Sequence, residues 1–257
     1  MTLFAVLGAI PSLFSRKATY WVVRNFAGSV ILLARIICGL KVELRGEVPT
    51  GNVVIASKHQ SFFDVILHAY YLENVNFVMK QELTYFPIVG FYGKRLGVAP
   101  VKRGGKGKAV SQMMSGLEKS DQDTQLVIYP QGTRVAPGKV MPYKVGAAVV
   151  CQRMNRRCIL AATNVGMYWP KHSLLRKRGT VVLEYLGEVP NDLQTKSFVK
   201  YIEKNIEKAS KSLRIPHLII HGTEDEAASE WNGNREGAVA RRSSDSLRSW
   251  KRASWRS

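Results

Sequence analysis

The chain has 257 residues, 46% of them hydrophobic and 22% charged, which is enough to bury a sizeable core in one large domain or two small ones. Its 38 Lys and Arg residues outnumber 19 Asp and Glu residues and give a net charge of +19. This charge favours a polyanionic partner, either nucleic acid or an anionic membrane surface with phosphate-bearing substrates. Cys38, Cys151 and Cys158 match no metal or redox spacing, so we expect reduced thiols in a protein that faces the cytosol.

The N-terminus carries two apolar stretches separated by basic residues. Residues 1–14 are largely apolar but include Pro11, and residues 26–40 are apolar except around Arg35. Neither stretch reaches the roughly 18 to 20 clean apolar residues that a simple membrane-spanning helix needs. We therefore expect residues 1–40 to form a helical membrane-associating segment, with two helices lying in or dipping into one leaflet. A signal peptide and two ordinary core helices are the alternatives.

Residues 41–221 alternate between short apolar runs and amphipathic segments. The apolar runs predict strands at 41–45, 53–56, 76–79, 98–101, 126–129, 158–165 and 180–186. Helical spacing predicts helices at 61–72, 82–96, 108–118, 144–154 and 197–213. This alternation indicates an α/β domain with a largely parallel sheet flanked by helices. Ligands of such sheets bind beyond the carboxyl ends of the strands.

From Gly222 onward the composition shifts to Gly, Ser, Ala and charged residues without a sustained period. This composition predicts a disordered basic tail over residues 222–257. Trp250 and Trp255 lie among basic residues there, so the tail either contacts an anionic surface or is simply solvated.

The strongest local motif is His59 followed five residues later by Asp64, between a predicted strand and a predicted helix. On a regular helix, side chains five residues apart diverge by roughly 140°. The two side chains therefore meet only if His59 precedes the helix and Asp64 lies in its first turn. A carboxylate that holds one imidazole nitrogen leaves the other as a base for a hydroxyl proton. Alternatively, Asp64 only completes a helix cap with Ser61.

Two further loops follow predicted strands and carry cations. Lys102 and Arg103 precede a glycine loop, and cations beside exposed backbone amides make a phosphate cradle. The run 131–134, Gln-Gly-Thr-Arg, makes a tight turn in which Arg134 can bind a phosphate through two donors. Each loop taken alone is also typical of an ordinary surface turn.

In order and spacing, the three motifs resemble those of the glycerolipid acyltransferase (PlsC-like) family, in particular its bacterial 1-acyl-sn-glycerol-3-phosphate acyltransferases. The resemblance covers roughly residues 40–213. It implies that His59 deprotonates the sn-2 hydroxyl of 1-acylglycerol 3-phosphate (lysophosphatidic acid), while Asp64 orients the imidazole. The hydroxyl oxygen then attacks the thioester of acyl-CoA or acyl carrier protein, giving phosphatidic acid for phospholipid biosynthesis. Neither a metal nor a cofactor is expected.

The resemblance also implies a binding site and a location. The expected ligands of the acceptor phosphate are Arg103, Gly132, Thr133 and Arg134, with Gln131 and Lys102 as further acceptor contacts. The expected location is the cytoplasmic face of a bacterial inner membrane.

Two positions depart from the family pattern. Gln131 stands where the family usually has Glu, which keeps the hydrogen-bonding capacity and loses the charge. Lys102 stands where an acid often precedes the Arg. The alternatives are therefore a different lysolipid or glycerol 3-phosphate as acceptor, or a non-catalytic lipid-binding protein. No nucleic acid partner is expected, because basic and aromatic residues interleave only in the tail.

Overall fold

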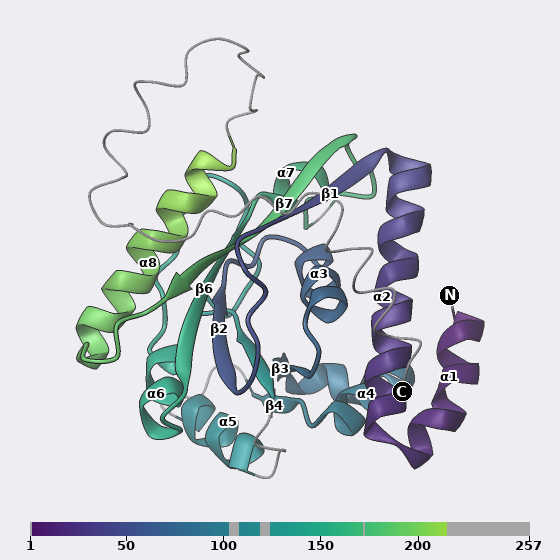
Figure 1. Ribbon diagram of the computed structural model, residues 1–257, viewed down its shortest axis with the longest axis horizontal. Coiled ribbons are helices and arrows are strands. Elements are labelled where there is room, and N and C mark those ends of the chain that lie inside the picture. Colours follow the sequence, from purple (N-terminus) through teal and green to yellow (C-terminus); the bar gives the residue numbers. More distant parts are fainter. Residues whose placement is uncertain (1, 103–107, 119–123, 172, 215–257) are drawn as a thin grey trace. The chain divides into compact units, whose positions relative to one another are not determined.

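Helices surround one central sheet in the computed structural model of the chain (Figure 1). The structure describes residues 2–102, 108–118, 124–171 and 173–214. These residues all belong to one compact unit, Met1–Ile215. In chain order, the elements are α1 (Thr2–Phe14), α2 (Arg16–Cys38), β1 (Leu40–Arg45), β2 (Val53–Ser57), α3 (Phe63–Tyr71), β3 (Val75–Lys80), the 3-10 helix η1 (Gln81–Tyr85), α4 (Pro87–Leu96), β4 (Ala99–Val101), α5 (Lys108–Glu118), β5 (Gln125–Ile128), α6 (Gly146–Arg153), β6 (Arg157–Thr163), α7 (Val165–Tyr168), β7 (Gly179–Glu188) and α8 (Thr195–Ser212).

The strands of the described chain form a seven-stranded sheet in the order β1-β7-β6-β2-β5-β3-β4. The β6–β7 pair is antiparallel, and the other neighbouring pairs are parallel. Every residue of β2 and β5 is buried, as expected for central strands that are covered on both faces. The predicted α/β class with a largely parallel, helix-flanked sheet is confirmed.

The alternation of side chains along β2 separates the two faces of the sheet. Val53 and Ile55 pack in the core that α2 and α3 cover, whereas Val54 and Ala56 pack in the core that α5, α6 and α8 cover. Figure 1 shows α2 and α3 on one side of β2 and α8 on the other. Because successive strand residues point to opposite faces, the side chains of the first residues after β2 also point alternately to one face of the sheet and to the other.

The N-terminal helix α2 is longer than expected. It has 23 residues from Arg16 to Cys38 and, by length and composition alone, is apolar enough to cross a membrane. It reaches this length by including the basic residues that precede the apolar stretch 26–40. Its basic residues fall within the helix and do not end it. One face packs on the domain through Thr19, Val22, Ala27 and Ala34. The opposite face exposes large apolar side chains, namely Trp21, Leu32, Leu33, Ile36 and Ile37.

Two other elements differ from the predictions. The single helix predicted over 82–96 is η1 followed by α4, because Pro87 cannot continue a helix and instead starts one. The short helix α7 follows β6 where the prediction extended the strand. The predicted glycine loop at 104–107 and the predicted tail at 222–257 lie outside the described residues.

Candidate active site

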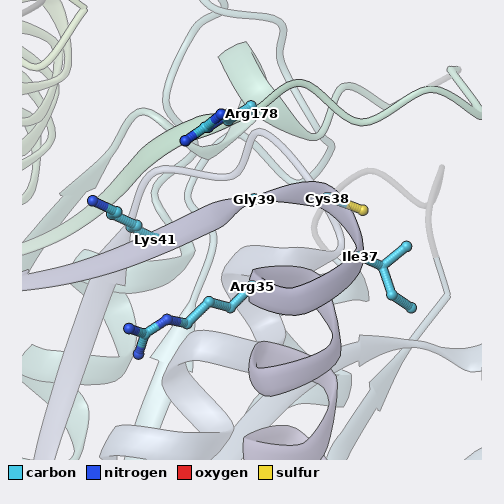
Figure 2. A pocket seen from close by; sticks show the side chains of 6 residues that line it. All are labelled: Arg35, Ile37, Cys38, Gly39, Lys41 and Arg178. Atoms are coloured by element: carbon cyan, nitrogen blue, oxygen red, sulfur yellow. The ribbon is translucent and has the colours of Figure 1, made fainter.

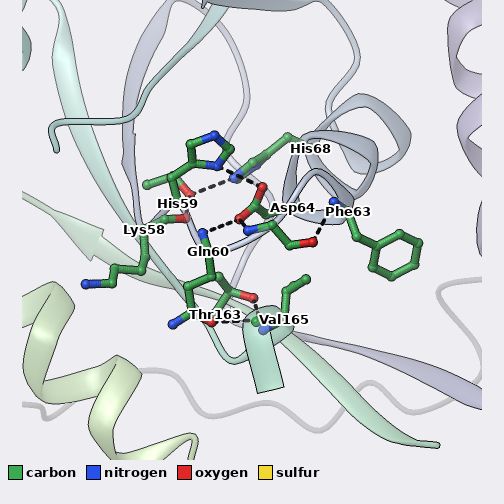
Figure 3. Close-up of polar contacts among 11 residues, drawn as sticks. Lys58, His59, Gln60, Phe63, Asp64, His68, Thr163 and Val165 are labelled. Atoms are coloured by element: carbon green, nitrogen blue, oxygen red, sulfur yellow. Dashed lines mark hydrogen bonds and ion pairs between the residues drawn. The ribbon is translucent and has the colours of Figure 1, made fainter. Parts of the chain in front are cut away.

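The loop after β2 brings His59 and Asp64 together (Figure 3). His59 precedes α3, and Asp64 lies in the first turn of that helix. His59 Nδ1 is 3.0 Å from Asp64 Oδ1. The side chain of His59 is 14% exposed, while that of Asp64 is fully buried. If the ring donates through Nδ1, its Nε2 lone pair remains available as a base.

Asp64 combines the two roles that its sequence position allowed. Its Oδ1 faces the His59 ring, and its Oδ2 accepts hydrogen bonds from the backbone N–H groups of Gln60 at 2.7 Å and Ser61 at 2.9 Å. The hydroxyl of Ser61 accepts from the N–H of Phe63 at 3.3 Å. The carboxylate therefore satisfies the amides of the loop and, through its other oxygen, fixes the imidazole.

Tyr129 and Val135, on either side of the turn at 131–134, both contact His59. The His59 ring stacks on the Tyr129 ring with a centroid distance of 3.9 Å and an interplanar angle of 20°. The Val135 N–H donates to the carbonyl oxygen of His59 at 2.8 Å. Burial raises the pKa of Tyr129 well above its usual value, so the phenol stays protonated. The imidazole is therefore held in plane by Asp64 and on its face by Tyr129.

The run 132–134 forms the turn that follows β5. Gly132 has a φ of +68° and donates its N–H to Tyr129 O at 2.8 Å, which is a conformation that favours glycine. Thr133 and Arg134 are half-buried beside it. A Cβ on Gly132 would lie 3.0 Å from Lys144 Nζ, so a further ammonium group covers this turn. No sequence pattern singled out Lys144.

Gln131 faces a different set of partners. Its side chain is buried, and its Nε2 donates to Met141 O at 3.2 Å and to Glu207 Oε1 at 3.4 Å. The same Glu207 oxygen accepts from Tyr143 OH at 3.0 Å and from the Lys58 ammonium. Lys58 extends toward α8, away from His59, as the alternation along β2 requires (Figure 3). Sequence reasoning missed Glu207, since it lies on a distant helix.

The second predicted loop lies farther along the sheet edge. Lys102 follows β4 with an exposed side chain, and Arg103 lies outside the described residues. Three strand spacings separate β2 from β4 in the sheet order, so Lys102 starts about 14 Å from the end of β2. Lys80 ends β3, one strand nearer, with its Nζ 3.1 Å from Glu82 Oε1. The structure therefore gathers cations along this edge but does not bring Lys102 into contact with His59.

A fully buried histidine, His68, lies next to the site. His68 Nε2 is 2.9 Å from Ser57 Oγ, and His68 Nδ1 is 3.2 Å from Tyr185 OH. Burial lowers the pKa of His68 to about 4, against a smaller opposing effect of Asp64, so this ring is neutral at physiological pH. Within the described ranges, no group of three His, Cys, Asp or Glu side chains is placed to hold a metal ion.

Known proteins resemble this chain in sequence and in fold. The family model described as Acyltransferase matches residues 39–168. The chain is 29% identical over 174 residues to a 1-acyl-sn-glycerol-3-phosphate acyltransferase of Pseudomonas aeruginosa, covering 66% of this chain and 68% of that protein. It is 35% identical over 119 residues to the Helicobacter pylori protein of the same name, covering 46% of this chain and 50% of that one.

A solved structure supports the fold assignment. The crystal structure of a 1-acyl-sn-glycerophosphate acyltransferase from Thermotoga maritima matches with a TM-score of 0.68 and 18% sequence identity. The match covers 83% of this chain and 90% of that one. The family model spans the His59–Asp64 pair, the cationic loop and the turn at 131–134. The chain therefore belongs to the Acyltransferase family, as the motifs predicted.

Proposed function

We propose that this protein transfers a fatty acyl group from acyl-CoA or acyl carrier protein to the sn-2 hydroxyl of 1-acylglycerol 3-phosphate, giving phosphatidic acid. The observation that carries the proposal is the buried Asp64 carboxylate 3.0 Å from one nitrogen of a partly exposed His59. The names of the Pseudomonas and Helicobacter relatives support the acceptor and the reaction.

The mechanism follows from the two nitrogens of His59. Nε2 accepts the proton of the acceptor hydroxyl as its oxygen attacks the thioester carbonyl, and Asp64 stabilises the imidazolium that forms. The tetrahedral intermediate then expels the thiolate, which takes the proton back from Nε2. The products are the ester and a free thiol, so neither an acyl-enzyme nor a metal is required.

The acceptor phosphate would be held by the cationic edge of the sheet. Arg134 offers a bidentate guanidinium from the turn that follows β5, the strand next to β2, and Gly132 and Thr133 add backbone and hydroxyl donors. Lys102 follows the more distant β4, and we expect it and the next residue in the sequence, Arg103, to complete the cradle. This concentration of positive charge favours a phosphate-bearing acceptor over a zwitterionic lipid.

We place the protein at a membrane, with the active site on the cytoplasmic face of a bacterial inner membrane. The support is the apolar exposed face of α2 together with the exposed Leu7, Ile10, Leu13 and Phe14 of α1. An acceptor that itself resides in a bilayer would be reached most easily by an enzyme on the same surface.

The test of the reaction is thioester consumption by the purified full chain in detergent micelles. His59→Ala is expected to lower kcat roughly 10²- to 10⁴-fold while its thermal unfolding stays close to the parent's. A folded variant with near-normal turnover would exclude His59 as the base. Binding of the lysolipid without any thioester consumption by the parent protein would instead support a non-catalytic lipid-binding protein.

The acceptor is tested with a panel of 1-acylglycerol 3-phosphate, glycerol 3-phosphate and a lyso-ornithine lipid. We expect the first to be preferred. Arg134→Ala and Arg103→Ala should raise the KM of this acceptor more than the KM of acyl-CoA. Equal effects on both KM values would contradict a role in holding the acceptor phosphate.

A further inference from the structure

The loop between α7 and β7 exposes two leucines among basic residues. Leu174 is 97% exposed and Leu175 is 80% exposed. Residues 169–179 include Lys171, Arg176, Lys177 and Arg178 but no Asp or Glu. A pair of apolar side chains at a loop tip, surrounded only by positive charge, is typical of a contact with an anionic lipid surface.

The leucines are held outward by contacts within the loop. The Ser173 hydroxyl accepts from the N–H of Leu175 at 3.1 Å, and the Arg176 guanidinium donates to the carbonyl oxygen of Ser173. The Arg176 guanidinium also lies 4.2 Å from the Trp169 ring centroid. Trp169 in turn stacks on Phe63 at 4.8 Å. These contacts fix the turn to α3 and keep Leu174 and Leu175 exposed at its tip.

An open pocket of about 430 Å³ joins this loop to the end of α2 (Figure 2). Its lining includes Arg35, Lys41 and Arg178 but no carboxylate. The side chain of Arg178 lies over Gly39, where an added Cβ would be 2.9 Å from Arg178 Cγ. In Figure 2 the charged ends of these three residues turn to one side and Ile37 turns to the other.

Ile37 of α2 lines this pocket, and Ile36 precedes it in the same helix. Ile36 is 69% exposed and Ile37 is 75% exposed, and both continue the apolar face of the helix. Apolar side chains thus lie beside a pocket of three cations. A phosphodiester between two or three cations, with its acyl chains against Leu and Ile side chains, satisfies both features at once.

We propose that Leu174, Leu175, Ile36 and Ile37 insert into a bilayer whose anionic phospholipid headgroups bind Arg35, Lys41 and Arg178. We call these residues, which come from α2, β1 and the α7–β7 loop, the lipid surface. It rests on the proposed function in one respect, since an acceptor in the bilayer gives the enzyme reason to lie on it. It adds a lipid contact from a loop far from the N-terminus in sequence, fixed to the helix that carries Asp64.

An acidic protein partner is the rival occupant of this surface. Cations would attract it, but the exposed apolar side chains continue along α2, and α2 is the helix with the length and composition of a membrane segment. The lipid bilayer therefore accounts for the loop, the pocket and the helix together.

The experiment places an environment-sensitive fluorophore on the loop of the full-length chain. The label is attached at Leu174→Cys in a Cys38→Ser background, because Cys151 and Cys158 are buried. The matched control carries the label at Lys204→Cys, an exposed position of α8 on the other face of the sheet. Labelled protein is mixed with phosphatidylcholine vesicles that contain or lack phosphatidylglycerol, some with brominated acyl chains.

The proposal predicts a blue shift and quenching by brominated chains for the label at 174 and not for that at 204. Replacing Arg35, Lys41 and Arg178 by Gln should weaken the response to phosphatidylglycerol vesicles roughly tenfold or more, whereas replacing Lys200, Lys204 and Lys208 by Gln should not. The charge replacements are made with the label at 174 in both cases.

Two outcomes would overturn the proposal. One is a label at 174 that remains in water while the protein is bound to vesicles. The other is a response to acyl carrier protein and none to vesicles, which would make the surface a protein dock. Thioester consumption in detergent micelles is measured on the same proteins. If the parent protein consumes no thioester, the proposed function is contradicted, whatever the fluorophore reports.

Discussion

Lys58 and Glu207 form an ion pair behind the base, although 149 residues separate them in the sequence. Lys58 is 2% exposed, and the same Glu207 oxygen also accepts from Tyr143 and Gln131. One carboxylate on α8 thus connects the loop that carries His59 with the turn that follows β5. Burial of Tyr143, with Glu207 beside it, raises the pKa of the phenol and keeps it a donor.

Glu207→Gln should destabilise the protein, because it leaves the Lys58 ammonium buried without an opposite charge. Breaking such a pair costs roughly 3 to 5 kcal/mol, and we expect the lower end because Glu207 is 24% exposed. The expected fall in Tm is roughly 6 to 12 °C, measured by calorimetry. Glu203→Gln, one turn earlier on α8, is the control and should change Tm far less.

Gln131→Glu in the Glu207→Gln background should restore much of the lost Tm. The Gln131 amide and the Lys58 ammonium bind the same oxygen, so a carboxylate at 131 would lie within reach of Lys58. Gln131→Glu alone should be unfavourable, since it sets two carboxylates side by side. Strictly additive effects of the two substitutions would show that positions 131 and 207 do not share Lys58.

The sequence was informative where local pattern determines structure. Apolar runs such as 53–56 predicted the central strands, and the spacing of His59 and Asp64 allowed their contact only with His59 before the helix and Asp64 in its first turn, as the structure has them. It was uninformative where distant elements meet. Glu207 belongs to the charged side of an amphipathic helix, which normally indicates a solvated face. Lys144 over Gly132 likewise depends on how the chain returns after the turn, which no local pattern encodes.

Asp64→Asn should lower turnover by at least about 100-fold, because an amide cannot stabilise the imidazolium as a carboxylate does. It should also weaken the loop, since Oδ2 accepts two backbone N–H groups. The control is Ser61→Ala, which removes the hydroxyl bonded to Phe63 N and leaves His59 untouched. We expect this variant to lose about 1 kcal/mol of stability and to keep its kcat. A similar kcat for Asp64→Asn and the parent would reduce Asp64 to a helix cap.

Tyr129→Phe tests whether the ring or the hydroxyl supports His59. The Tyr129 hydroxyl is buried and, in the described part of the chain, has no hydrogen-bond partner, whereas its ring stacks on the imidazole. Removing an unpaired buried hydroxyl should leave stability unchanged or raise it by about 1 kcal/mol, with turnover retained. Tyr129→Leu, which removes the stack, should lower kcat while leaving the KM of the acyl donor nearly unchanged. A large loss of kcat in Tyr129→Phe would instead assign chemistry to the hydroxyl.

His68 should make the protein acid-labile above the range in which carboxylates titrate. Burial lowers its folded-state pKa from 6.5 to about 4, so the unfolded chain binds a proton there that the folded chain does not. Stability is therefore full above pH 6.5 and falls by about 3 kcal/mol as the pH is lowered to 4. His68→Gln keeps a polar group beside Ser57 and Tyr185 but cannot take up that proton.

Urea unfolding of the two proteins between pH 8 and pH 4 measures this contribution. The parent should lose about 3 kcal/mol more than His68→Gln over that interval, with most of the difference appearing below pH 6.5. Any stability that the substitution itself removes is constant with pH and is read at pH 8, where His68 is neutral in both states. Parallel stability curves for the two proteins would mean that His68 is protonated in the folded state, and that Ser57 and Tyr185 accommodate the charged ring.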